Sequence, residues 1–106
     1  MASITGAGRT TPGQGWQRYA DGPGIYLDVN TAGAGFNAAF ETPAYTISLG
    51  GNQSMWYLAG SSSVYSPTLT GFRVYLRNLE LDKDPLTVQQ AAGWGLHINW
   101  IGIQTF

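Results

Sequence analysis

Apolar residues recur at every second position along much of the chain, which is the period of a β-strand. The pattern is clearest in three segments: IYLDV at 25–29, YTISL at 45–49 and GFRVYLRNL at 71–79. Each alternates between an apolar face and a second face, so each predicts a strand with one buried face. The residues predicted to face the core are Ile25, Leu27, Val29, Tyr45, Ile47, Leu49, Phe72, Val74 and Leu76.

Shorter segments predict the remaining strands. They are FNAAF at 36–40, MWYLA at 55–59, LTVQQA at 86–91 and the end of the chain at 94–106. No stretch of about 12 residues carries the apolar stripe of an amphipathic helix. Short strands with frequent turn signals are typical of two packed antiparallel sheets. The expected fold is therefore all-β, a six- to seven-stranded antiparallel β-sandwich.

The N-terminal segment differs in composition from the rest. Residues 1–15 are mostly Gly, Thr, Ser and other small residues, with little to bury. Such a composition predicts a flexible arm. We therefore expect an arm at 1–15 and one folded domain at 16–106, a size that can bury a core without disulfides.

The last segment, WGLHINWIGIQTF, changes its pattern at Asn99. Up to that residue one face of the predicted strand is apolar and the other polar; after it, both faces are apolar, because Ile101 and Ile103 lie opposite Trp100. An apolar second face is stable in water only if something covers it. Either another subunit covers the two isoleucines, or a β-bulge near Asn99 rotates the strand.

Composition excludes several classes of function. With Lys+Arg of only 5 and a net charge of −1, the chain has no basic surface for nucleic acid. No apolar run approaches the roughly 20 residues of a membrane-spanning helix, so membrane insertion is not expected. The N-terminus lacks the pattern of a signal peptide. The expected location is a virion or the extracellular space after lysis or export, and otherwise the cytoplasm.

Candidate catalytic and metal-binding residues are few. His97 is the only histidine, but the serines at 61–63 lack the context of a nucleophile elbow. The segment ELDKD places Glu80, Asp82 and Asp84 at alternate positions, without the rest of a calcium loop, and favours a solvated turn. We expect no enzyme activity, no metal and no cofactor.

Aromatic residues make up 13% of the chain and suggest a different chemistry. Sugars combine an apolar C–H face with a rim of hydroxyls, and a flat ring with a few fixed polar groups complements both. Trp56 and Trp94 lie beside loop-like residues and could stack on a sugar, although core packing is an alternative for each. On 71–79, Arg73, Tyr75 and Arg77 form the second face, which favours a subunit contact or open surface over an anionic ligand site.

Three stretches of the chain resemble the H-type lectin domain family. They are AAFETPAYTISLGG, SVYSPTLTGFRVYL and HINWIGIQTF, and the likeness as a whole covers roughly residues 16 to 106. The residues that carry the resemblance are Phe40, Pro43, Tyr65, Ser66, Thr70, Gly71, Phe72, Ile98, Trp100, Ile101 and Ile103.

The resemblance implies a six-stranded antiparallel sandwich that forms a homotrimer and binds N-acetylgalactosamine or galactose between protomers. Asp28 lies near the position of the family's sugar-binding Asp. The family's Arg, on the strand before the Thr-Gly-Phe turn, has no match in YLAGSSSV, and Trp94 and His97 lie nearer the chain end than the family's aromatic and His.

We therefore expect a trimeric, non-catalytic carbohydrate-binding module that recognises cell-surface glycans. The expected sugar contacts are Asp28, Trp56 and Trp94. The residues expected at the oligomer interface are Tyr75, Arg77, His97, Ile101 and Ile103. The alternative is a structural trimerising tip of a phage tail fibre or similar shaft, without a sugar site of its own.

Overall fold

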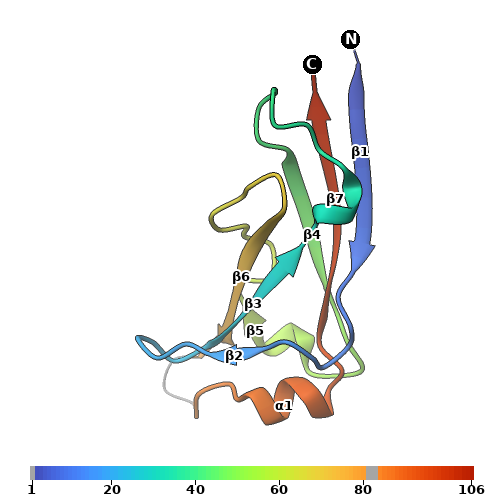
Figure 1. Cartoon of the computed structure of the whole chain (residues 1–106). Helices are drawn as coiled ribbons and strands as arrows, with labels where there is room; N and C mark the ends of the chain where they lie inside the picture. The colour runs from blue at the N-terminus through green and yellow to red at the C-terminus, as the bar shows by residue number, and fades with distance from the viewer. Residues whose placement is uncertain (1, 81–83) are drawn as a thin grey trace.

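The chain is mostly β-strand, arranged as two antiparallel sheets with one short helix (Figure 1). The computed structural model describes residues 2–80 and 84–106. The strands are β1 (Ser3–Arg9), β2 (Gln17–Arg18), β3 (Ile25–Asn30), β4 (Ala44–Gly50), β5 (Leu58–Ala59), β6 (Gly71–Asn78) and β7 (His97–Thr105). One sheet has the order β1-β7-β4 and the other β2-β3-β6-β5. The helices are α1 (Val88–Gly93) and two single 3-10 turns, η1 (Ala32–Ala34) and η2 (Met55–Tyr57).

The two sheets share one core, as the period-2 pattern predicts. The inward residues of β3 and β6 are at most 4% exposed. They pack with Leu96 and Ile98, which are fully buried, and with the half-buried inward side chains of β4. Trp16 belongs to the same core, where its indole Nε1 donates to the Leu96 carbonyl at 2.9 Å. The predicted all-β architecture is confirmed at this level.

Strand β7 runs without interruption through Asn99. Its pairing with β4 continues residue by residue on either side of that position, and its pairing with β1 runs without a skipped residue from Thr105 up to Asn99, so the β-bulge alternative is wrong. Ile101 and Ile103 therefore point away from the core on the outer face of the sheet, where they are 42% and 43% exposed. No helix in the described residues is long and apolar enough to cross a membrane.

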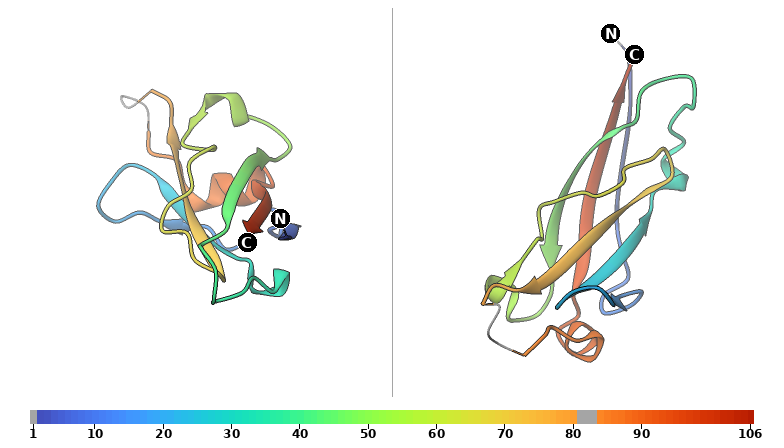
Figure 2. Two further views of the ribbon diagram at one scale, coloured as in Figure 1. Left: turned by 90° about the horizontal axis from the view of Figure 1, so that it is seen from above. Right: turned by 90° about the vertical axis from the view of Figure 1, so that its left-hand side faces the viewer.

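The first residues of the chain form an edge strand where the sequence predicts a flexible arm. Ser3–Arg9 pair with β7 along their whole length, and the pairing extends to Ala2 and Phe106, which exchange two backbone hydrogen bonds of 2.9 Å. Backbone pairing needs no buried side chains, so the mainly small residues of β1 give no period-2 signal. Figure 2 shows the two chain ends side by side at one tip of the molecule.

Three other segments also differ from their predicted strands. In LTVQQA, Val88–Gly93 form α1, because Thr87 and Gln90 make a capping box with two 3.1 Å hydrogen bonds. FNAAF is a loop with a turn, in which the Asn37 side chain accepts the N–H of Ala39. MWYLA contributes only η2 and the two-residue edge strand β5.

Candidate functional site

Aromatic and charged side chains gather on the outer face of the sheet β2-β3-β6-β5. Strand alternation puts them there, because their neighbours on β3 and β6 face the core. The register then aligns Tyr26 with Tyr75 and Asp28 with Arg73 across the two strands. We call this surface the tyrosine face, and its members are Tyr19, Tyr26, Asp28, Tyr65, Arg73, Tyr75 and Arg77.

Asp28 and Arg73 form a bidentate ion pair at its centre. Arg73 Nε donates to one carboxylate oxygen at 2.6 Å and Nη2 to the other at 3.0 Å. The guanidinium also lies 4.1 Å from the centre of the Tyr26 ring, and Nη1 is 3.4 Å from the Tyr75 hydroxyl. The Arg73 hydrogen bond lowers the pKa of Asp28, and the same bond raises the pKa of Arg73. With Asp28 still 55% exposed, its carboxylate is fixed in direction and open to solvent.

The lowered pKa predicts how this pair responds to pH. Its stabilising effect is fully present above the ordinary Asp pKa of 3.8 and is lost as pH falls through the lower folded value. In a carboxyl-carbon NMR titration, Asp28 should titrate below pH 3.8 in the wild type. In Arg73→Gln it should titrate close to the ordinary value; a midpoint that does not move would contradict the ion pair.

Tyr75 is the centre of an aromatic cluster. Its ring centre lies 5.1 Å from that of Tyr19, 6.0 Å from Tyr26 and 4.8 Å from Tyr65, with the Tyr19 and Tyr65 rings edge-on. Backbone hydrogen bonds hold the two loop tyrosines: Tyr65 exchanges two of 2.8 Å with Arg73, and the Tyr19 N–H donates to Gly24 at 2.9 Å. The rings are therefore positioned before any ligand arrives.

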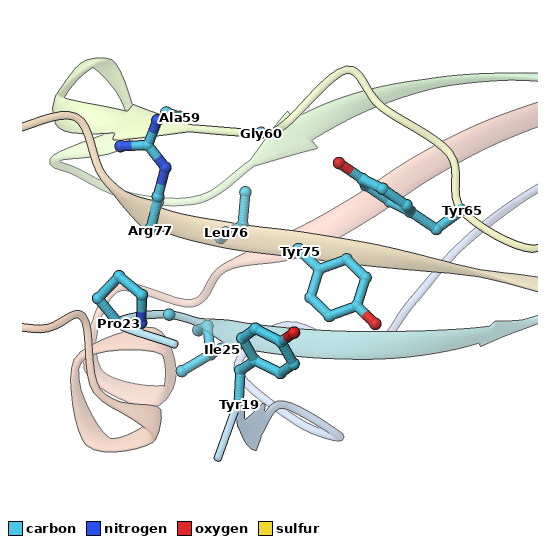
Figure 3. Close-up of a pocket in the computed structure, with 10 residues that line it drawn as sticks. Tyr19, Pro23, Ile25, Ala59, Gly60, Tyr65, Tyr75, Leu76 and Arg77 are labelled. Carbon is cyan, nitrogen blue, oxygen red and sulfur yellow. The ribbon is translucent and has the colours of Figure 1, made fainter. Parts of the chain in front are cut away.

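A groove of about 400 Å³ opens between these rings (Figure 3). Tyr19 and Tyr65 lie on either side of Tyr75, and Arg77 stands at one end. Gly24 and Gly60 line the same groove, where any side chain would clash with backbone oxygens of β6. A second hollow of about 400 Å³ adjoins the groove at Tyr75 and contains Asp28 and Arg73 with hydroxyls of the loop before β6. Apolar ring faces thus lie beside fixed donors and acceptors.

The predicted sugar contacts do not form one site. Asp28 belongs to the tyrosine face, whereas Trp56 lies on η2, 78% exposed, with its ring centre 4.3 Å from that of Tyr57. Trp94 lines a different hollow with Tyr57 and Asn78. Asn78 is at the end of β6, about 17 Å along the strand from Arg73. Trp94 is half-buried and packs against the core, and neither tryptophan lines the hollow that contains Asp28.

The residues predicted at the oligomer interface lie on the outer faces of two different sheets. Tyr75 and Arg77 belong to the tyrosine face, while His97, Ile101 and Ile103 lie on the outer face of the sheet β1-β7-β4. These are the outer faces of two sheets that share one core between them, so the five residues cannot all meet the same neighbour in one flat contact. His97 is half-buried, and its Nδ1 lies 3.1 Å from the Gly95 carbonyl oxygen.

Little in the described part of the chain suggests a metal site. Among residues 2–80 and 84–106, no three His, Cys, Asp or Glu side chains are close enough to hold a metal ion. Of the candidate turn, Asp82 lies outside the described residues. The backbone carbonyl of Asp84 accepts a short hydrogen bond from the Asn78 side chain.

Sequence reasoning missed Tyr19, Tyr26 and Tyr65. Tyr26 could have been predicted from strand alternation, since it occupies an outward position on a strand, as Tyr75 does. Tyr19 and Tyr65 come from loops, and only the folded arrangement brings them to Tyr75. The chain matches no family model, and no significantly similar curated protein or solved structure was found.

Proposed function

We propose that the protein is a non-catalytic carbohydrate-binding module whose sugar site is the tyrosine face. One observation carries the proposal: a cluster of four tyrosines, in which three surround Tyr75, lies beside a solvent-accessible Asp28–Arg73 pair on the outside of a sheet. Tyrosine rings pack on sugar C–H faces, while carboxylate, guanidinium and phenol groups hydrogen-bond to hydroxyls.

The groove is open, so a single site should bind weakly. A shallow site for one or two sugar units typically gives a Kd near 1 mM, about −4 kcal/mol. Useful affinity then requires several sites acting together on a glycan-coated surface. This requirement favours an oligomer.

The H-type lectin resemblance, with its six-stranded sandwich, is part of the proposal. The two-sheet architecture is compatible with it. Arg73 directly follows the Thr-Gly-Phe stretch, and it supplies beside Asp28 the cation that is missing from the preceding segment. Galactose-type sugars are the first ligands to test on this basis.

We further propose a homotrimer assembled through the outer face of the sheet β1-β7-β4. Ile101 pairs with Ala7 and Thr46, and Ile103 pairs with Thr5 and Ala44. These small neighbours leave the two isoleucines on a flat surface. A partner that covers them removes apolar area from water, the main source of stability in such contacts.

Replacing Ile101 with aspartate tests the assembly. Because Ile101 is 42% exposed, Ile101→Asp should leave the fold of each subunit intact while placing a charge in the contact. In sedimentation analysis the wild type should be a trimer and Ile101→Asp a monomer, with Ser62→Asp remaining trimeric as the control. A monomeric wild type or a trimeric Ile101→Asp would contradict the assembly.

The exposed isoleucines equally favour a second function, a trimerising tip of a phage fibre or similar shaft. In that case the protein would act in a virion, and the tyrosine face would have no ligand. A glycan array probed at high protein concentration separates the two functions. Binding to at least one glycan class supports the lectin, whereas a trimer that binds none of them leaves the structural tip.

A further inference from the structure

The charged side chain of Arg77 lies at one end of the groove on the tyrosine face. It follows Tyr75 by two positions on β6 and therefore shares its outward face. Its Nη1 donates to the carbonyl oxygens of Asn78 at 3.1 Å and Leu79 at 3.4 Å. These two contacts fix the guanidinium where Figure 3 shows it, at the end of the groove near Ala59.

Comparison with Arg73 shows what Arg77 lacks. Arg73 uses the edge formed by Nε and Nη2 to hold both oxygens of Asp28. The same edge of Arg77 has no hydrogen-bond partner among residues 2–80 and 84–106, and the only ion pair within those ranges is Asp28–Arg73. Among the residues that the structure describes, the Arg73 guanidinium thus holds a carboxylate, whereas the same edge of Arg77, four residues further along the strand, holds none.

We propose that the groove binds an acidic sugar, a uronic or sialic acid unit, whose carboxylate pairs with the Nε–Nη2 edge of Arg77. This inference rests on the proposed glycan-binding function and names its ligand class. The sugar ring would pack against Tyr75 and Tyr65, which line the groove beside Arg77. The groove's volume of about 400 Å³ lies within the ~300–1,000 Å³ range of small-ligand sites.

A carboxylate suits this edge better than a neutral hydroxyl does. The guanidinium edge is planar and presents two parallel donors, the geometry that a carboxylate accepts with both oxygens. A neutral sugar would cover part of a charged group without neutralising it, which weakens binding. Sulfate and phosphate esters can also accept from both donors of this edge, so a sulfated glycoside is compared with the carboxylates in the test.

The test compares matched ligands by NMR titration of the whole protein. The ligands are the methyl glycosides of glucuronic acid and sialic acid, their carboxyl-reduced counterparts, and a sulfated neutral glycoside. The wild type should bind at least one acidic glycoside about tenfold more tightly than its reduced counterpart, as expected for one charge-assisted bidentate contact.

Variants assign the preference to Arg77. Arg77→Gln should bind the acidic and reduced glycosides equally, and Arg77→Lys should retain only part of the preference, because it keeps the charge and loses the fork. Arg9→Gln, which removes an arginine from the other sheet, should behave as the wild type. A preference that persists in Arg77→Gln would overturn the assignment.

The remaining outcomes separate this inference from the proposed function. Equal binding of acidic and reduced glycosides by the wild type would overturn the inference and leave the lectin intact. A sulfated glycoside that binds as tightly as the carboxylate would overturn the carboxylate specificity. Failure of every glycoside, together with an empty glycan array, would overturn both proposals.

Discussion

Tyr75→Ala should reduce glycan affinity at least tenfold, the largest loss expected from any single change on the tyrosine face. Tyr75 contacts three other tyrosines, and it lines both the groove and the hollow around Asp28. Its removal takes away a stacking surface and the ring against which the Tyr19 and Tyr65 rings pack. A central aromatic commonly contributes more than about 1.4 kcal/mol to binding, which corresponds to tenfold.

Calorimetric or NMR titration with the best array glycan measures this loss. Tyr75→Phe keeps the ring and should retain most of the affinity. Tyr57→Ala removes an exposed tyrosine outside the tyrosine face and should have no effect. If Tyr75→Ala binds as the wild type does, or Tyr57→Ala weakens binding equally, the site is elsewhere.

Gln104→Leu should lower the free energy of unfolding by about 2–4 kcal/mol, the largest loss of stability expected from a polar residue. Gln104 is 1% exposed on the inner face of β7. Its Oε1 accepts the Asn37 N–H at 2.7 Å, and its Nε2 donates to the carbonyls of Asn37 at 2.8 Å and Glu41 at 2.7 Å. Leucine has a similar volume but leaves these three backbone groups without their partner.

Urea unfolding followed by tryptophan fluorescence measures the effect. The matched control is Thr105→Val, one residue further along β7 on the exposed side, which should change stability by less than about 0.5 kcal/mol. A Gln104→Leu protein as stable as the wild type would mean that the loop at 36–43 is not held through Gln104.

The strands that bury one face can be predicted from the sequence, because one-sided burial requires an apolar residue at every second position. That is why the inward residues of β3, β4 and β6 are predicted correctly. Strand β1 has no such alternation and could not be predicted in this way, since it is held through its backbone and buries almost no side chain. In the segment of α1, local capping by Thr87 and Gln90 outweighs a weak strand signal.

The candidate site was less predictable than the fold. Alternation places Tyr75, Arg77 and Asp28 outward, as the structure has them, while the role of Asp28 as a sugar contact stays a prediction. Its partner Arg73 depends on the register between β3 and β6, which the sequence does not reveal. Trp56 and Trp94 were predicted as sugar contacts because they are large aromatics near loops, but neither lies on the tyrosine face.

The most direct test of the central proposal is a two-dimensional NMR titration with an acidic oligosaccharide and its neutral counterpart. Binding at the tyrosine face predicts saturable shifts in the backbone amides of Tyr19, Tyr65, Arg73, Tyr75 and Arg77, with those of Ile101 and Trp94 unchanged. Shifts confined to the region of Trp94 or Ile101, or no shifts at millimolar ligand, would contradict the account.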